Sequence, residues 1–380
     1  ILIIVLINFV YFKTKFVFQK YLYVKKLKKT QKGYDYFVEA MIALLNNDNK
    51  SASNSARKMR GFLKKDTSLN LLLQSEILKI EKQSDQLNEV YDLMIKNNKT
   101  KTLGLRGLME QSLKQQDYHH AFIYGEKLFL LNPKIEKLYD TLLNIIAKTK
   151  NWNQLTVITD KAYMNKIINK EQAYENKSIA LYEIAKIKMK SDAKESIKLI
   201  EKAIAMKKNF PPYIKLYLEI LFSIGDTIKI QKILKKYWTA IPTSSLRFCI
   251  TNVLKANNIK ELSFVKKFVE KNLNNDESKK LLVDFAIYFN EWSIARESIK
   301  GLIGANPSRE ICLFMSEIEL GELNDIQKSE GWKLRANNAN LENYWVCNIT
   351  NNPQKDWSAL SESGHFNSLE WRQQKMLSVI

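Results

Sequence analysis

Two adjacent histidines, His119 and His120, are the side chains in this 380-residue chain that could hold a cofactor. A neutral imidazole ligates metals, and it serves as an axial ligand of haem. Both histidines open a predicted helix, on which neighbouring residues point about 100° apart. They therefore cannot chelate one ion together, and each is a separate candidate haem ligand, with a solvated or helix-capping role as the alternative. His365, the third histidine, is interpreted in the same way.

The remaining reactive residue types do not form a catalytic or metal-binding pattern. The three cysteines, Cys249, Cys312 and Cys347, are far apart and odd in number, which indicates a reducing compartment rather than a disulfide framework. Glu317 and Glu319 do not share a helical face, and no nucleophile–base pair or glycine-rich phosphate loop occurs. We therefore predict no catalytic residues, no bound metal and no enzyme activity.

The elements that carry these residues are predicted to be helical hairpins. In the stretch 102–135, Leu105, Leu108 and Met109 recur at three- and four-residue steps and so share one helix face. The pattern breaks at residues 115–117, and a second helix follows from Tyr118 to Pro133, which ends it. Small residues on that second helix, Ala121 and Gly125, let the two backbones approach closely.

The hairpin recurs along the chain with a period of about 34 residues, which is typical of tetratricopeptide repeats. Tyr118, Ala121 and Pro133 have the same spacing as Trp292, Ala295 and Pro307. Further matches to the Ala position follow the same period: Leu155, Ser196 and Ile230. We therefore predict an all-α, tetratricopeptide-like α-solenoid over residues 34–337, with an irregular α-helical bundle as the alternative. Between Tyr163 and Asn176 the register slips by about seven residues, so we expect a longer connection there and a helix from Lys177.

The N-terminal residues have the composition of a helix that leaves a membrane. Residues 1–12 are apolar apart from Asn8, and residues 13–33 carry lysines interleaved with aromatic residues and no acid. This order is typical of the cytoplasmic end of a transmembrane helix, whereas a signal peptide has the reverse order. A solvated basic helix is the alternative. The membrane-surface lysines are Lys13, Lys15, Lys20, Lys25, Lys26, Lys28, Lys29 and Lys32.

The formal charge of +20 also invites a nucleic-acid interpretation, which we do not favour. Lysine greatly outnumbers arginine and is spread along the chain, whereas nucleic-acid sites usually use clustered arginine forks. Residues 338–380 differ from the rest, because they are rich in tryptophan and have little helical period. We predict a small irregular module there, packed on the last repeat.

Three segments together resemble the HemY-type family of bacterial inner-membrane proteins, which is associated with haem synthesis. They are GYDYFVEAMIALLNNDNKSASNSARKM after the lysine-rich segment, LGLRGLMEQSLKQQDYHHAF from Leu103, and the tail YWVCNITNNPQKDWSALSESGHFNSLEW. The tail is similar to the family's ending at Trp345, Val346, Cys347, Trp357, Gly364, Phe366, Leu369 and Trp371. The resemblance covers nearly the whole chain.

The resemblance implies a scaffold without activity of its own, tethered to the inner membrane with its repeats in the cytoplasm. Its partners would be late haem (protoporphyrin) synthesis enzymes. Two alternatives stay open: a haem or porphyrin carrier, with His119 and His120 as ligands, and a regulator of lipopolysaccharide assembly. A sister family with the latter role ends in a metal module with paired cysteines, but Thr350, Ser361 and Ser363 stand here where cysteines would be expected. One thiolate cannot form a four-ligand zinc site.

Overall fold

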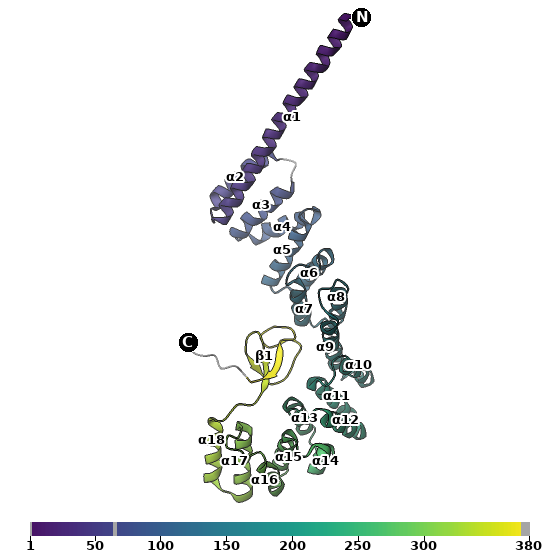
Figure 1. The fold of residues 1–380 in the computed structure, drawn as a ribbon, viewed down its shortest axis with the longest axis vertical. Helices are drawn as coiled ribbons and strands as arrows, with labels where there is room; N and C mark the ends of the chain where they lie inside the picture. The colour runs from purple at the N-terminus through teal and green to yellow at the C-terminus, as the bar shows by residue number, and fades with distance from the viewer. Residues whose placement is uncertain (1, 64–66, 374–380) are drawn as a thin grey trace. The chain divides into compact units, whose positions relative to one another are not determined.

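The computed structural model describes residues 2–63 and 67–373, a succession of helical hairpins that ends in a small sheet (Figure 1). The chain divides into two compact units, one up to residue 145 and one from residue 146, and each is described by itself. The first unit contains α1 (Leu2–Leu45), α2 (Asn49–Phe62), α3 (Thr67–Ile80), α4 (Ser84–Lys96), α5 (Lys101–Lys114), α6 (Tyr118–Leu131) and the start of α7 (Leu138–Thr149).

The second unit continues the hairpins and adds the sheet. Its helices are α8 (Trp152–Met164), α9 (Lys170–Lys188), α10 (Ala193–Met206), α11 (Pro211–Ile224), α12 (Thr227–Ala240), α13 (Ser244–Ala256), α14 (Leu262–Val269), the short η1 (Glu270–Asn272), α15 (Asp276–Tyr288), α16 (Trp292–Lys300), α17 (Arg309–Leu323) and α18 (Ile326–Asn337). The predicted all-α helical-repeat architecture is confirmed for the described residues up to 337.

The turn inside the hairpins follows from a few residue types. Before the second helix, one residue has a left-handed backbone, with φ between +52° and +74°: Asn47, Lys82, Gln116, Lys150, Gly225, Asn290 and Asn324. This conformation ends the first helix and favours glycine and asparagine. The next residue caps the second helix, and an aspartate carboxylate accepts a backbone N–H at Asp48, Asp117, Asp192, Asp226 and Asp325.

Four residues after each N-cap, the second helix presents a side chain that is at most 2% exposed. These residues are Ala52, Leu87, Ala121, Leu155, Ser196, Ile230, Ala295 and Ser329. The set includes all the residues that the 34-residue spacing placed at the Ala position. A buried, mostly small side chain at this point brings the two helices of a hairpin close together, so the predicted repeat is confirmed as a packing repeat.

The prediction was wrong in two places. Helix α9 begins at Lys170 rather than Lys177, because Asn169 and Gln172 form a capping box that extends the helix through the expected connection. The tail is not irregular: β1 (Tyr344–Cys347) pairs in antiparallel fashion with β2 (Pro353–Gln354) and β3 (Leu369–Arg372), in the order β2-β1-β3. These strands are too short to show alternation in the sequence, and the pairing of β1 with β3 is non-local.

The N-terminal segment is a single helix. Because α1 runs from Leu2 to Leu45, the expected boundaries at residues 12 and 33 fall inside one element. Within the described part of the chain, no helix combines the length and apolar character needed to cross a bilayer. In the expected membrane-spanning stretch, residues 1–12, side chains are described only for residues 9, 11 and 12.

Gly107 tests the packing between two successive hairpins. A Cβ at this position of α5 would collide with the ring of Tyr91 in α4, which is only 3% exposed. We expect Gly107→Ala to lower the free energy of unfolding by about 1–3 kcal/mol, as overpacked cores do, measured by urea denaturation and circular dichroism. The matched control is Gly61→Ala in α2, where an added Cβ meets no atom within 4 Å. Equal stability of the two variants would contradict this packing.

Candidate functional site

The first candidate surface is the basic aromatic segment, residues 9–32 of α1. The exposed fraction of its described large apolar side chains ranges from 40% for Val24 to 67% for Phe16. Lysines lie over aromatic rings one helical turn away, with Lys13 5.8 Å from the ring centroid of Phe9. The same arrangement joins Lys15 to Tyr11 and Lys25 to Tyr21. This is an extensive apolar surface interleaved with positive charge, and such surfaces are usually interaction sites.

The end of this segment coincides with the start of tertiary packing. Gly33 lies so close to Leu63 that a Cβ there would collide with the leucine side chain. Two helical turns further on, α1 buries Ala40 completely and continues as the first helix of the first hairpin. The segment and the first helix of the first hairpin are therefore parts of one continuous helix, α1.

The two adjacent histidines lie on the surface of α6. Both are exposed, and their ring centroids are 5.6 Å apart. Nδ1 of His120 is 2.7 Å from Oδ2 of Asp117, whose Oδ1 accepts the backbone N–H of His120. These hydrogen bonds lower the pKa of Asp117. The structure thus makes Asp117 the cap of α6 and His120 its hydrogen-bond partner on the surface, and haem ligation by either histidine stays a prediction.

The tail residues that carry the resemblance are brought together in the C-terminal module, residues 338–373. Trp345, Cys347 and Trp357 are at most 6% exposed. Gly364 has a left-handed backbone (φ +82°), which explains the glycine there, and Phe366 bridges to Leu360. The rings of Trp345 and Trp371 are 5.3 Å apart, across the paired strands β1 and β3.

A cluster of hydroxyl groups surrounds the thiol of Cys347. Its Sγ donates to Oγ of Ser368 at 3.3 Å, and Thr350 and Ser363 share a 2.8 Å hydrogen bond beside it. Burial disfavours the thiolate, but hydrogen bonds with Ser368 and Thr350 outweigh this effect and lower the pKa of Cys347 to about 6. Neither at Cys347 nor elsewhere among the described residues do three or more metal-ligating side chains come together. Ser361 caps the turn instead, accepting the N–H of His365.

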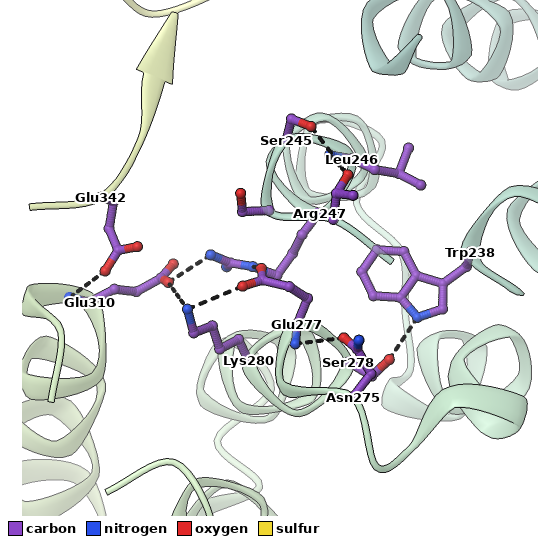
Figure 2. Close-up of polar contacts among 12 residues, drawn as sticks. Trp238, Ser245, Leu246, Arg247, Asn275, Glu277, Ser278, Lys280, Glu310 and Glu342 are labelled. Carbon is purple, nitrogen blue, oxygen red and sulfur yellow. Dashed lines mark hydrogen bonds and ion pairs between the residues drawn. The ribbon is translucent and has the colours of Figure 1, made fainter. Parts of the chain in front are cut away.

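A buried ion-pair network joins three successive hairpins in the second unit (Figure 2). Arg247 of α13, 7% exposed, donates to Glu277 of α15 at 2.7 Å and to Glu310 of α17 at 2.6 Å. Lys280 lies 3.2 Å from Glu277, and the backbone N–H of Glu310 donates to Glu342 at the start of the module. Burial raises the pKa of Glu310, and the charge of Arg247 opposes this shift.

Sequence reasoning missed this network and the aromatic residues that receive the module. Arg247 and its carboxylate partners are separated by 30 and 63 residues. Each is one charged residue among many on a helix, and only the stacking of hairpins shows that they meet. The one available signal was that α13, α15 and α17 hold these residues near corresponding positions.

Comparisons with known proteins agree with helical repeats and go no further. No family model and no curated protein matches the chain. It is similar to a tetratricopeptide repeat protein from Parabacteroides merdae (15% identity, covering 66% of this chain and 98% of that one, TM-score 0.32). It is also similar to the structure of Naa15/Naa10 bound to HypK-THB, with 13% identity, coverage of 82% of this chain and 50% of that one, and a TM-score of 0.43. A third similar structure is the TPR2AB domain of yeast Sti1 in a pHSP90 complex, with 11% identity, coverage of 80% of this chain and 98% of that one, and a TM-score of 0.34. At these identities and TM-scores, nothing about function rests on the likeness.

The ion-pair network yields a stability prediction for the second unit. Truncation in Arg247→Ala leaves Glu277 and Glu310 as partly buried charges with one cation fewer, so we expect the free energy of unfolding to fall by up to about 3–5 kcal/mol. Tryptophan fluorescence during urea denaturation reports this unit alone, because all seven tryptophans follow residue 145. The control is Lys333→Ala, whose exposed pair with Glu330 should be worth less than about 1 kcal/mol. Similar midpoints for both variants would rule out an important role for the network.

Proposed function

We propose that this protein is a membrane-tethered, non-catalytic repeat scaffold that binds other proteins and assists late haem biosynthesis. We infer the tethering from the continuity of α1. The basic aromatic segment passes directly into the first hairpin, so whatever holds residues 9–32 also holds the repeats. Anionic head groups attract lysines at about 1 kcal/mol each near the surface, and aromatic rings favour the same interfacial depth.

The distribution of side chains favours a helix that enters the membrane end-on. A helix that lies flat on a bilayer separates its apolar and charged faces. In the basic aromatic segment, lysines and aromatic rings occur all around the helix, because Lys25, Lys26 and Lys28 point in three different directions. A helix that passes through the head-group layer meets the same environment on every side, so it needs no such separation.

The scaffold role follows from the repeat architecture, whose stacked hairpins present long surfaces to other proteins. Holding partners on one tethered surface raises their effective concentration for one another. The assignment to haem synthesis is supported by the resemblance of the three segments to the HemY-type family. Partners would accordingly be the enzymes that act on coproporphyrinogen, protoporphyrinogen and protoporphyrin. Recovery of none of these enzymes after cross-linking and purification from native membranes would contradict this part of the proposal.

The carrier alternative has no observation in its favour, since both candidate ligands are exposed and His120 is bonded to Asp117. A saturable Soret shift on adding haem, abolished by His119→Ala and His120→Ala, would revive it. The lipopolysaccharide alternative would be favoured if an envelope intermediate, rather than a porphyrin, accumulated on deletion.

The lysines of α1 provide the test of tethering. We expect replacement of Lys25, Lys26, Lys28 and Lys29 by Gln to weaken binding to vesicles that contain anionic phospholipid by up to about a thousandfold, at roughly 1 kcal/mol per lysine. Co-sedimentation measures the binding, and the loss should shrink in high salt as screening increases.

The matched control replaces four exposed lysines of α10 and α12, Lys194, Lys202, Lys232 and Lys235. It changes the net charge equally and should leave vesicle binding almost unchanged. If the two quadruple variants weaken binding alike, the attraction belongs to the net charge of the chain, and the tether proposal fails.

A further inference from the structure

The C-terminal module packs on one face of the second unit. This face is formed by the first helices of successive hairpins, α9, α11 and α13, and Figure 1 shows β1 beside them. Four aromatic side chains of this face receive the module: Tyr182 from α9, Phe210 and Tyr213 at the start of α11, and Phe248 from α13. We call this set the aromatic groove.

Three tryptophans of the module contact the aromatic groove: Trp357, Trp371 and, at 6.1 Å from the ring centroid of Phe210, Trp345. The ring of Trp357 makes edge contacts with Tyr182 and Phe210, at 5.2 Å from each centroid, and with Tyr213 at 6.0 Å. Trp371 lies 5.3 Å from Phe248, and its Nε1 donates to Oγ of Ser244 at 2.9 Å. Aromatic contacts of this kind are the usual anchors of a protein–protein interface.

Polar contacts fix the orientation of the module at its edges. Nζ of Lys215 on α11 is 2.6 Å from Oδ1 of Asp356, the residue before the buried tryptophan. Glu183 of α9 accepts a backbone hydrogen bond from Ala359, and burial raises the pKa of its carboxyl group. The face therefore recognises an acidic residue followed by tryptophan, by charge on one side and by aromatic contact on the other.

The module has little means of staying folded away from this face. It spans residues 338–373 and contains one cysteine, so it cannot form an internal disulfide. Modules of this size usually need disulfides, a metal or docking for stability. Its three strands have two to four residues each. Trp357, which is 6% exposed, makes its ring contacts with the aromatic groove.

One feature of the docked state is unfavourable. Nε1 of Trp357 is buried and has no hydrogen-bond partner among the described residues. A buried unpaired donor opposes burial of the group that carries it. The same ring is the central anchor of the module, so the docked state retains a cost at its centre, which an occupant with a better-placed acceptor would not have.

We propose that the module is an intramolecular ligand of the aromatic groove, folding on it and occupying it, so that this face binds another protein only when the module leaves. The partner that fits is a segment presenting an acidic residue followed by tryptophan. The inference rests on contacts within the second unit, and it stands whether or not the chain is tethered to a membrane.

The first experiment opens the groove in the full chain. Trp357→Ala removes the anchor, and a labelled synthetic peptide with the sequence of residues 344–373 is then titrated by fluorescence anisotropy. We expect the variant to bind the peptide, and the unaltered chain to bind it at least about tenfold more weakly, because its groove is occupied. Equal binding by both chains, or binding by neither, would overturn the proposal.

The second experiment leaves the aromatic groove intact, so that a folding defect in the first cannot decide the question. Asp356 is half exposed, and Asp356→Lys places a like charge beside Lys215. We expect faster hydrogen exchange over residues 344–372 in this variant, and recovery in the charge-swapped pair Lys215→Asp with Asp356→Lys. If exchange in the single variant matches that of the unaltered chain, or if the pair fails to recover, the contact does not hold the module.

Discussion

Close contact between the two helices of each hairpin is the constraint on which the rest of the structure depends. A mostly small, fully buried residue four positions after each N-cap, such as Ala52, Ala121 or Ala295, permits that contact. The left-handed residue and the capping aspartate before it set the angle at which the second helix returns. Because these features recur, each hairpin presents its first helix in a similar way, and within the second unit the first helices α11, α13, α15 and α17 contact one another in turn. A fold of this kind gains its stability from neighbouring repeats rather than from one central core.

The two ends of the repeat series are completed in opposite ways. At the N-terminal end, the first helix of the first hairpin continues outward as the basic aromatic segment, with its apolar surface exposed. In the second unit, the chain beyond α18 returns to cover the first helices α9, α11 and α13. The N-terminal end therefore leaves apolar surface exposed, while the C-terminal end of the chain covers an aromatic face of the second unit. In both places, tryptophan, tyrosine or phenylalanine rings lie beside lysines. Partial burial of such rings at an interface is favourable, because they bury a large apolar area and attract nearby cations.

Charge acts differently in the two places. The lysines of α1 are exposed, and their effect on any one conformation of the chain is small and screened by salt. Arg247 is buried between Glu277 and Glu310, so its interactions are less screened but were formed at the cost of desolvating all three groups. Such a network orients α13, α15 and α17 because its hydrogen bonds must all be satisfied at once. Glu342 adds the linker of the module to the same network, so the end of the repeats and the placement of the module are coupled.

The sequence by itself determined the local features of this protein. Apolar periodicity, turn residues and the 34-residue spacing located the hairpins to within a few residues, because these signals act between residues close in the chain. Tertiary structure decided the rest. The strands of the tail exist because β1 and β3, more than twenty residues apart, pair with each other. The aromatic groove draws Tyr182, Tyr213 and Phe248 from three hairpins, none of which differs in the sequence from an ordinary core residue. Contacts between distant residues depend on how the hairpins stack, and no local pattern encodes that stacking.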